Sequence, residues 1–245
     1  MQHVTGGSNW GNNASGITFT NINTPFSASF TAGADGTVGN TEILNAYNKM
    51  ANPDAIDIPL IVSGPGNATV AASLITLAET RKDSLVFLSP TKSSVVNNAG
   101  SESSAVISFR DSLTSSSYAV MDSGYKYQYD RYNDVYRYVP LNGDTAGLAV
   151  RTDFIADPWF SPAGFNRGQI KNVVKLPFSP SKTDRDTLYK NGVNPVVSFP
   201  GQGTVLFGDK TLLSKPSAFD RINVRRLFIV LEKAIATAAK FQLFE

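Results

Sequence analysis

Few residues of the kinds that carry most enzyme chemistry occur in this chain. It contains no cysteine and a single histidine, His3, close to its beginning. Thiol nucleophiles, disulfides and metal sites with cysteine ligands are therefore excluded. A Ser–His–Asp triad or a histidine-based metal site would depend entirely on His3, for which a solvated position in a polar terminal stretch is the simpler interpretation.

Ser-x-x-Lys spacings and one glycine-rich turn are similar to known catalytic or phosphate-binding patterns. Two of the serine and lysine pairs lie beside prolines, Ser89 with Lys92 and Ser179 with Lys182. Lysine-activated serine chemistry needs companion motifs such as Ser-Asp-Asn and Lys-Thr-Gly, which the sequence lacks. The turn Gly-Pro-Gly-Asn at residues 64–67 lacks the dinucleotide fingerprint and the Gly-Lys-Ser/Thr of a P-loop, so we interpret it as a β-α connection.

Asp184 and Asp186 could be considered a carboxylate pair for glycoside or metal chemistry. Residues two apart on a helix point about 200° away from each other, so these carboxylates would not share a site. Ser181, three residues before Asp184, instead indicates a capped helix start with acid near its N-terminus. The sequence predicts no catalytic, cofactor-binding or metal site.

The most distinctive group of side chains is aromatic. Six of the nine tyrosines lie within residues 125–138. Tyr125, Tyr127 and Tyr129 alternate with polar residues, which indicates a strand with one aromatic face, and Asn133-Asp134 provides turn residues for a hairpin. Such a face could stack bases or sugars, cover a core, or form a protein interface. The near-neutral charge favours the core or the protein interface.

Composition and charge narrow the possible partners. The 245 residues are 42% hydrophobic and 17% charged, with a net charge of +2. This is enough apolar sequence to bury a sizeable core, and too little positive charge for a broad nucleic-acid footprint. No apolar run approaches the about 18 residues that a membrane helix requires. We therefore expect neither nucleic acid nor a membrane as a partner.

Helix and strand patterns alternate from about residue 40. The predicted strands are 56–62, 85–88 and 118–121, and the helices next to them are 40–50, 67–81 and 102–113. Later elements are hairpins at 125–139 and 196–207, helices at 144–150 and 181–190, and a strand at 173–176. The β-α-β order favours parallel pairing. The predicted fold class is α/β, with a mixed central sheet flanked by helices.

Residues 1–36 have a different pattern from the rest. They are rich in Gly, Ser, Thr and Asn, and their only periodic stretches, at 17–20 and 26–30, alternate as strands do. We interpret them as a short all-β piece, the end of a preceding β-rich domain, with residues 37–245 forming the α/β domain.

The strongest helical pattern lies at residues 222–239. Its 3.6-residue period predicts packing along the sheet through Val224, Leu227, Phe228, Leu231 and Ile235. Arg225 and Arg226 lie about 100° apart on this helix, so we expect at most one of them to face the core. An intramolecular ion pair or a contact outside the domain are the two interpretations of this arginine pair.

Three segments together resemble the contractile tail sheath proteins of myovirus-type bacteriophages. They are YKYQYDRYND at 125–134, AGLAVRTD at 146–153 continuing into WFSPAGFNRG at 159–168, and FDRINVRRLF at 219–228. Their order and spacing also match the family, and the resemblance covers roughly residues 36–245. Family chains typically begin with an extended arm and end with a further sheet-bearing segment, and we expect this chain to lack both.

The resemblance implies a structural subunit that needs no cofactor. Such a subunit polymerises as stacked hexameric rings around the tail tube and contracts to drive the tube through the host envelope. The implied partners are other sheath subunits, the tail tube protein, and the baseplate and tail terminator proteins. The implied location is the virion tail, after assembly in the host cytoplasm. Arg225, Arg226, Tyr127 and Tyr129 become candidates for the subunit or tube interface.

Two alternatives from other functional classes remain open at this point. An α/β enzyme would have its site at the carboxyl ends of the strands, near residues 63–67 and 89–91. It would require a concave site with perturbed titratable groups. A carbohydrate-binding module would use the tyrosine hairpin, and would require the rings to be exposed in a row.

Overall fold

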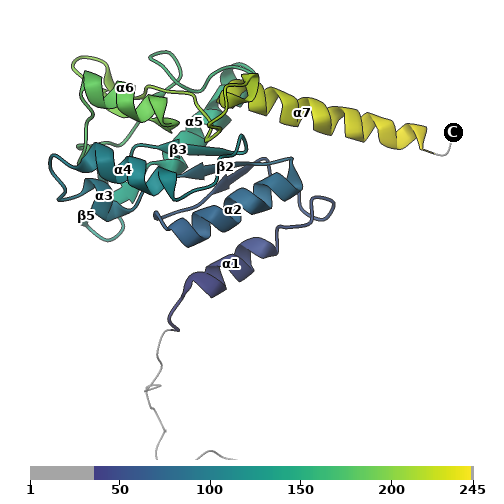
Figure 1. Cartoon of the computed structure of the whole chain (residues 1–245), viewed down its shortest axis with the longest axis horizontal. Helices are drawn as coiled ribbons and strands as arrows, with labels where there is room; N and C mark the ends of the chain where they lie inside the picture. Colours follow the sequence, from purple (N-terminus) through teal and green to yellow (C-terminus); the bar gives the residue numbers. More distant parts are fainter. Residues whose placement is uncertain (1–35, 244–245) are drawn as a thin grey trace, which may run out of the picture. The chain divides into compact units, whose positions relative to one another are not determined.

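A sheet of four parallel strands lies at the centre of the structure. A computed structural model of the chain describes residues 36–243, drawn in Figure 1. Strands β1 (Leu60–Val62), β2 (Leu85–Leu88), β3 (Ala119–Asp122) and β7 (Val193–Asn194) lie in that order, and each neighbouring pair is parallel. His3 and the strands predicted at 17–20 and 26–30 lie outside the described residues.

Antiparallel pairing occurs in two smaller sheets. Strands β4 (Tyr125–Asp130) and β5 (Val135–Pro140) form a hairpin, and β6 (Gln169–Ile170), β9 (Gly203–Leu206) and β8 (Val196–Phe199) form a three-stranded sheet. The predicted α/β class is confirmed. The central sheet itself is parallel throughout its described strands and not mixed, because short turns join antiparallel neighbours whereas longer helical crossovers join the parallel ones.

Seven α-helices of the described residues surround the sheets. They are α1 (Asn40–Asn48), α2 (Ala68–Arg81), α3 (Lys92–Val95), α4 (Glu102–Asp111), α5 (Asn142–Ile155), α6 (Lys182–Lys190) and α7 (Ile222–Ala239), with 3-10 turns η3 (Ala218–Asp220) and η4 (Lys240–Gln242). Helix α5 is longer than predicted, and α3, β6 and β7 were not predicted. The predicted strand at 173–176 is reduced to one bridge between Lys175 and Tyr127.

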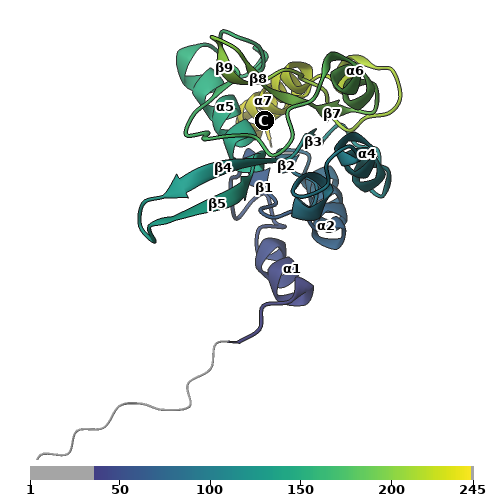
Figure 2. The same cartoon turned by 90° about the vertical axis from the view of Figure 1, so that its left-hand side faces the viewer.

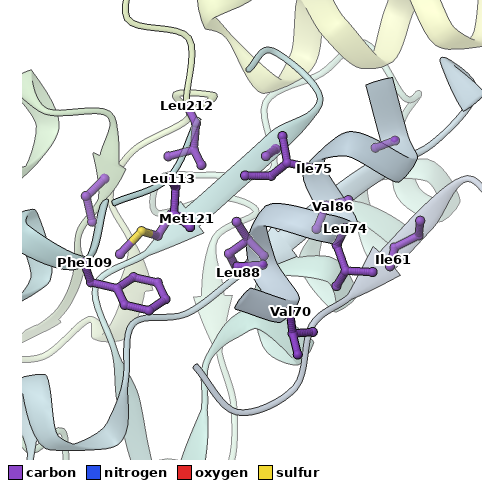
Figure 3. Packing of buried hydrophobic residues seen from close by; sticks show 14 of the residues in the cluster. Ile61, Val70, Leu74, Ile75, Val86, Leu88, Phe109, Leu113, Met121 and Leu212 are labelled. Carbon is purple, nitrogen blue, oxygen red and sulfur yellow. The ribbon is translucent and has the colours of Figure 1, made fainter. Parts of the chain in front are cut away.

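Side chains of the central strands alternate between two hydrophobic clusters. Val86 and Leu88 of β2 face the cluster that contains α2 and α4, part of which Figure 3 shows. Leu85 and Phe87 face the opposite cluster, formed with α5 and α7. All four β2 side chains are buried. A continuous apolar run is therefore explained by a strand that is covered on both faces.

Helix α7 packs on this second cluster through its first half only. Ile222 and Ile229 are the apolar residues of its buried face. The predicted packing through Leu231 and Ile235 is wrong, because these side chains are 44% and 67% exposed. Val224 and Leu227 are half-buried, and Phe228 is exposed. Figure 1 shows the far half of α7 extending beyond the sheet.

Two arginines complete the buried face of α7. The Arg225 guanidinium carbon lies 4.2 Å from the ring centre of Tyr118 and 4.1 Å from that of Phe219. Arg226 donates from Nη2 to the Asp153 carboxylate of α5 over 2.6 Å. The expectation that only one arginine faces inward is wrong, because these long side chains reach partners on different elements.

Hydrogen-bonded polar side chains close the carboxyl edge of the central sheet. Ser89 donates from Oγ to Asp122 over 2.7 Å and accepts the Asn142 backbone N–H over 3.0 Å. The Gly124 N–H donates to the other Asp122 oxygen over 2.8 Å. The Asn142 amide donates to Ser63 Oγ and to the Gly64 carbonyl. Burial, reinforced by the charge of Asp144, raises the pKa of Asp122 to about 8 despite these bonds.

Two substitutions on α7 test which face carries the packing. Ile229→Ala should lower the free energy of unfolding by about 2–5 kcal/mol, as truncation of a buried isoleucine does. Leu231→Ala, the matched control two residues later, should lower it by less than about 1 kcal/mol, because Leu231 is 44% exposed and lies outside the hydrophobic clusters of the described residues. Urea unfolding followed by circular dichroism measures both. Equal losses would contradict this orientation of the helix.

Replacing Asp122 by Asn should change the pH dependence of stability. The Asp122 carboxyl ionises near pH 4 in the unfolded chain but near pH 8 in the folded one. The contribution of Asp122 to the free energy of unfolding is therefore greatest below pH 4. It decreases as the pH rises to 8, by at most about 1.4 kcal/mol per pH unit. Asn keeps an acceptor for Gly124 and a donor for Ser89 without ionising. The variant should gain stability over the natural chain progressively from pH 4 to 8 in urea unfolding, and a constant difference would refute this.

Candidate functional site

The tyrosine hairpin carries one continuous aromatic face. The β4–β5 register places Tyr127 opposite Tyr138 and Tyr129 opposite Tyr136. The ring centres of Tyr127 and Tyr138 are 4.7 Å apart, and those of Tyr129 and Tyr136 are 5.1 Å apart. A diagonal stack between Tyr127 and Tyr136, at 5.4 Å, links the two pairs. Sequence alternation correctly predicted that Tyr127 and Tyr129 share a face, and the strand register adds Tyr136 and Tyr138 to it.

Burial decreases steadily from the base of this face to its tip. Tyr125 at the base is buried, and its hydroxyl accepts the Gly66 N–H over 3.1 Å. Tyr127 and Tyr138 are half-buried, whereas Tyr129 and Tyr136 are exposed. Figure 2 shows the hairpin extending from the rest of the domain. The face therefore belongs to the core at one end and to the surface at the other.

Polar interactions fix the turn at the hairpin tip. Asp134 adopts a left-handed backbone conformation, which aspartate tolerates in turns. Its carboxylate accepts the Tyr129 hydroxyl over 2.6 Å, and this bond raises the pKa of Tyr129. Asp130 accepts the Asn133 side-chain amide and pairs with Arg137 at 3.0 Å, and the Asn133 bond is the main cause that lowers the pKa of Asp130.

The opposite face of the hairpin is tied to helix α5. Lys126 is buried, and its ammonium donates to the Asp144 carboxylate over 2.8 Å and to the Lys171 carbonyl. Burial raises the pKa of Asp144, and the bond and charge of Lys126 partly offset that rise. This ion pair attaches the base of the ribbon to the helix that packs on the central sheet.

The tilted rings do not form a row of flat sugar platforms. Neighbouring rings meet at 46° and 50° and cover one another across the strands. The outermost ring, Tyr132, is 84% exposed and lies under the Arg131 guanidinium. Such tilted rings fit an irregular protein surface better than they fit a row of sugars. In a protein contact, tyrosine contributes buried area at low entropic cost.

The serine–lysine pairs and the glycine turn are used for structure. Ser89 bonds to Asp122, whereas the Lys92 ammonium lies 5.4 Å from the Tyr138 ring centre. The Ser179 hydroxyl accepts the Ser198 N–H, and Lys182 is an exposed residue at the start of α6. A side chain at Gly66 would collide with the Pro90 carbonyl, so the glycine allows close backbone packing.

Asp184 has the capping role that its spacing predicts. Its carboxylate accepts from Ser181 and from Ser103 of α4, and these bonds lower its pKa. Asp186 is exposed on the same helix and takes no part in this group. No group of three or more His, Asp or Glu residues suited to a metal ion occurs between residues 36 and 243. Within that same range, no helix is long and apolar enough to span a membrane.

The structure brings together residues that no pattern in the sequence linked. Asp122 and Asn142 meet Ser89 at the sheet edge, where the enzyme alternative expected a site, and they fill it with mutual hydrogen bonds. A usable signal was present, because an aspartate directly follows the predicted strand 118–121. Arg225, Arg226, Tyr127 and Tyr129 do not form one cluster. The arginines have partners within the chain, whereas Tyr129 is presented outward, and the interface role of all four stays a prediction.

Comparison with known proteins gives a consistent family. The model of the phage tail sheath protein central domain matches residues 36–212. The tail sheath protein of Vibrio phage KVP40 is 43% identical over 242 residues, covering 88% of this chain and 36% of the relative. The tail sheath protein of Enterobacteria phage T4 is 40% identical over 254 residues, covering 97% of this chain and 37% of the relative. The chain thus spans a little over a third of the length of these relatives.

Solved structures share the fold at much lower identity. The sheath complex of an extracellular contractile injection system, PVC, in its contracted state superposes with a TM-score of 0.65 at 18% identity, over 85% of this chain and 53% of that one. The contracted helical sheath of the anti-feeding prophage superposes with a TM-score of 0.63 at 18% identity, over 86% of this chain and 54% of that one. The family model matches more than half of the chain, and the two phage proteins are 43% and 40% identical to it over 88% and 97% of its length. The chain therefore belongs to the phage tail sheath protein family.

Proposed function

We propose that this chain is part of a structural subunit of a contractile phage tail sheath. In this role the subunit polymerises as stacked hexameric rings around the tail tube and contracts to drive the tube through the host envelope. The observation that carries the proposal is the 40–43% identity to phage tail sheath proteins over 88–97% of the chain. Contraction requires subunits that act as rigid bodies with two alternative packings.

The packing of the domain is consistent with such a rigid body. Both faces of the central sheet are covered, and ion pairs tie the hairpin and α7 to the same helix, α5. The proposed role requires no catalysis and no cofactor. The filled carboxyl edge of the sheet supports this, because an α/β enzyme needs an open site there.

The proposed partners follow from the same role. They are other sheath subunits, the tail tube protein, and the baseplate and tail terminator proteins, in the virion tail and, during assembly, in the host cytoplasm. Among the candidate contact residues, Tyr129 is available to a partner, with Tyr127 supporting it from the same face. Arg225 and Arg226 support assembly indirectly, by fixing α7.

Electron microscopy of the protein in its natural full length tests the proposed function. The expected result is hollow tubes built of six-fold rings, formed in the presence of tail tube protein. A protein that stays dispersed with the tube present, under conditions in which its fold is intact by circular dichroism, would overturn the proposal.

Removing the exposed tyrosines should weaken polymerisation without unfolding the domain. Tyr129→Ala combined with Tyr132→Ala should change the free energy of unfolding by less than about 1 kcal/mol, since both lie outside the core. The critical concentration for tube formation should rise at least about tenfold, as loss of an aromatic interface anchor does. Pelleting assays over a concentration series measure it.

Phe160→Ala is the matched control, because Phe160 is 42% exposed, close to the 46% of Tyr129, and lies outside the hairpin. Its critical concentration should stay within about twofold of the natural protein. Equal effects of the control and of the tyrosine variant would contradict a specific role for the hairpin.

A further inference from the structure

A cavity of about 270 Å³ lies outside the hairpin, next to the ends of α4 and α6. We call it the basic pocket. Its charged lining residues are Arg110, Asp111, Lys190, Lys210, Lys215 and Asp220. The pocket thus has two more cations than carboxylates, an excess equal to the net charge of the whole chain. This concentration of charge attracts anions.

The two carboxylates neutralise the pocket only weakly. Asp220 lies 3.5 Å from Arg221, so it already has a cationic neighbour. The Asp111 carboxylate is largely exposed and stands 4.0 Å from Arg110 Nη1, beyond hydrogen-bond distance. Lys190 and Lys215 are exposed, and Lys210 lies with its ammonium 4.7 Å from the Tyr189 ring centre.

Arg110 is the unusual member of the lining. The residue is 9% exposed, and its guanidinium makes one hydrogen bond, from Nη2 to the Leu212 carbonyl over 2.9 Å. Its Nε has no partner among the described residues. A buried guanidinium with so few acceptors is costly unless an anion balances it.

The other buried arginines of residues 36–243 are better compensated. Arg81 pairs with Asp83 and donates to two backbone carbonyls, and Arg226 pairs with Asp153. Arg225 has no carboxylate but lies between two aromatic rings. Arg110 has no aromatic ring beside it, and its one carboxylate neighbour, Asp111, is exposed and 4.0 Å away, so its charge is only weakly compensated within these residues.

The backbone holds Arg110 in place. Gly192 has a left-handed conformation, and a side chain there would lie 3.3 Å from the Thr211 carbonyl and 3.8 Å from Arg110 Nε. Glycine at this position therefore lets the 210–215 segment close over the guanidinium, which is then ordered before any ligand arrives. A preorganised charge binds with less entropic loss.

We propose that the basic pocket binds a small oxyanion, with Arg110 as its fixed donor and Lys190, Lys210 and Lys215 as mobile ones. Guanidinium and ammonium groups are the donors that carboxylate and phosphate oxygens prefer. The volume is below the range of drug-sized ligands and suits an anion of a few atoms. Two sources share this chemistry, namely a carboxylate of a second protein molecule and free inorganic phosphate.

Amide NMR titration of the 245-residue chain tests the proposal. Sodium phosphate and sodium glutarate are added separately at constant ionic strength maintained with sodium chloride. Saturable shifts of the Gly192 and Ser214 amides with either probe are expected. Tighter binding of glutarate identifies protein carboxylates as the source, and tighter binding of phosphate identifies the free ion. Shifts that grow linearly, or that sodium chloride alone reproduces, would overturn the proposal.

Paired lysine variants make the test specific to the pocket. Lys190→Gln with Lys215→Gln should raise the apparent Kd at least about tenfold, because two of the donors are removed. Lys49→Gln with Lys171→Gln removes the same charge from exposed positions outside the pocket and should leave the Kd within about twofold. Equal losses in both pairs would show that net charge alone binds the anion. None of these outcomes depends on whether the protein polymerises.

Discussion

Burial of the central parallel sheet on both faces is the constraint on which the rest of this domain depends. The four residues of β2 are apolar and inaccessible, so neither face of the strand can be left to solvent. Helices α2 and α4 cover one side, and α5 and α7 cover the other. Because parallel strands need long crossovers, α2, α4 and α5 not only cover the sheet but also lie in the connections between its strands. At the carboxyl edge of the sheet, the connection that leads into α5 packs against the strand ends through Asn142 and Ser89.

Buried polar groups in this domain serve mainly to close gaps between layers. Asp122, Ser89 and Asn142 join the carboxyl edge of the sheet to the start of α5, and Arg226 joins α5 to α7. Such groups are costly to bury singly and acceptable when they satisfy one another. This explains how an α/β sheet, a frequent framework for enzymes, here supports a domain of a structural family.

Periodicity predicted the central elements well because their signals are strong and local. The strand at 85–88, the helix at 67–81, the Ser181 cap and the shared face of Tyr125, Tyr127 and Tyr129 were all correct. The same method failed for α7, since a hydropathy pattern counts arginine as outward-facing, whereas Arg225 and Arg226 are inside. It also missed the basic pocket and the Asp122 network, whose members lie far apart in sequence. Contacts of that kind depend on tertiary packing, which no local window contains.

Helix α5 connects the hairpin mechanically to α7. Each hairpin strand has six residues, so the ribbon is a projection of about 20 Å whose base is clamped by the buried Tyr125 and by the Lys126–Asp144 pair. Asp144 and Asp153 belong to the same helix, and Asp153 holds α7 through Arg226. Both ion pairs end on α5, so a force applied at the hairpin tip would be transmitted through α5 to α7.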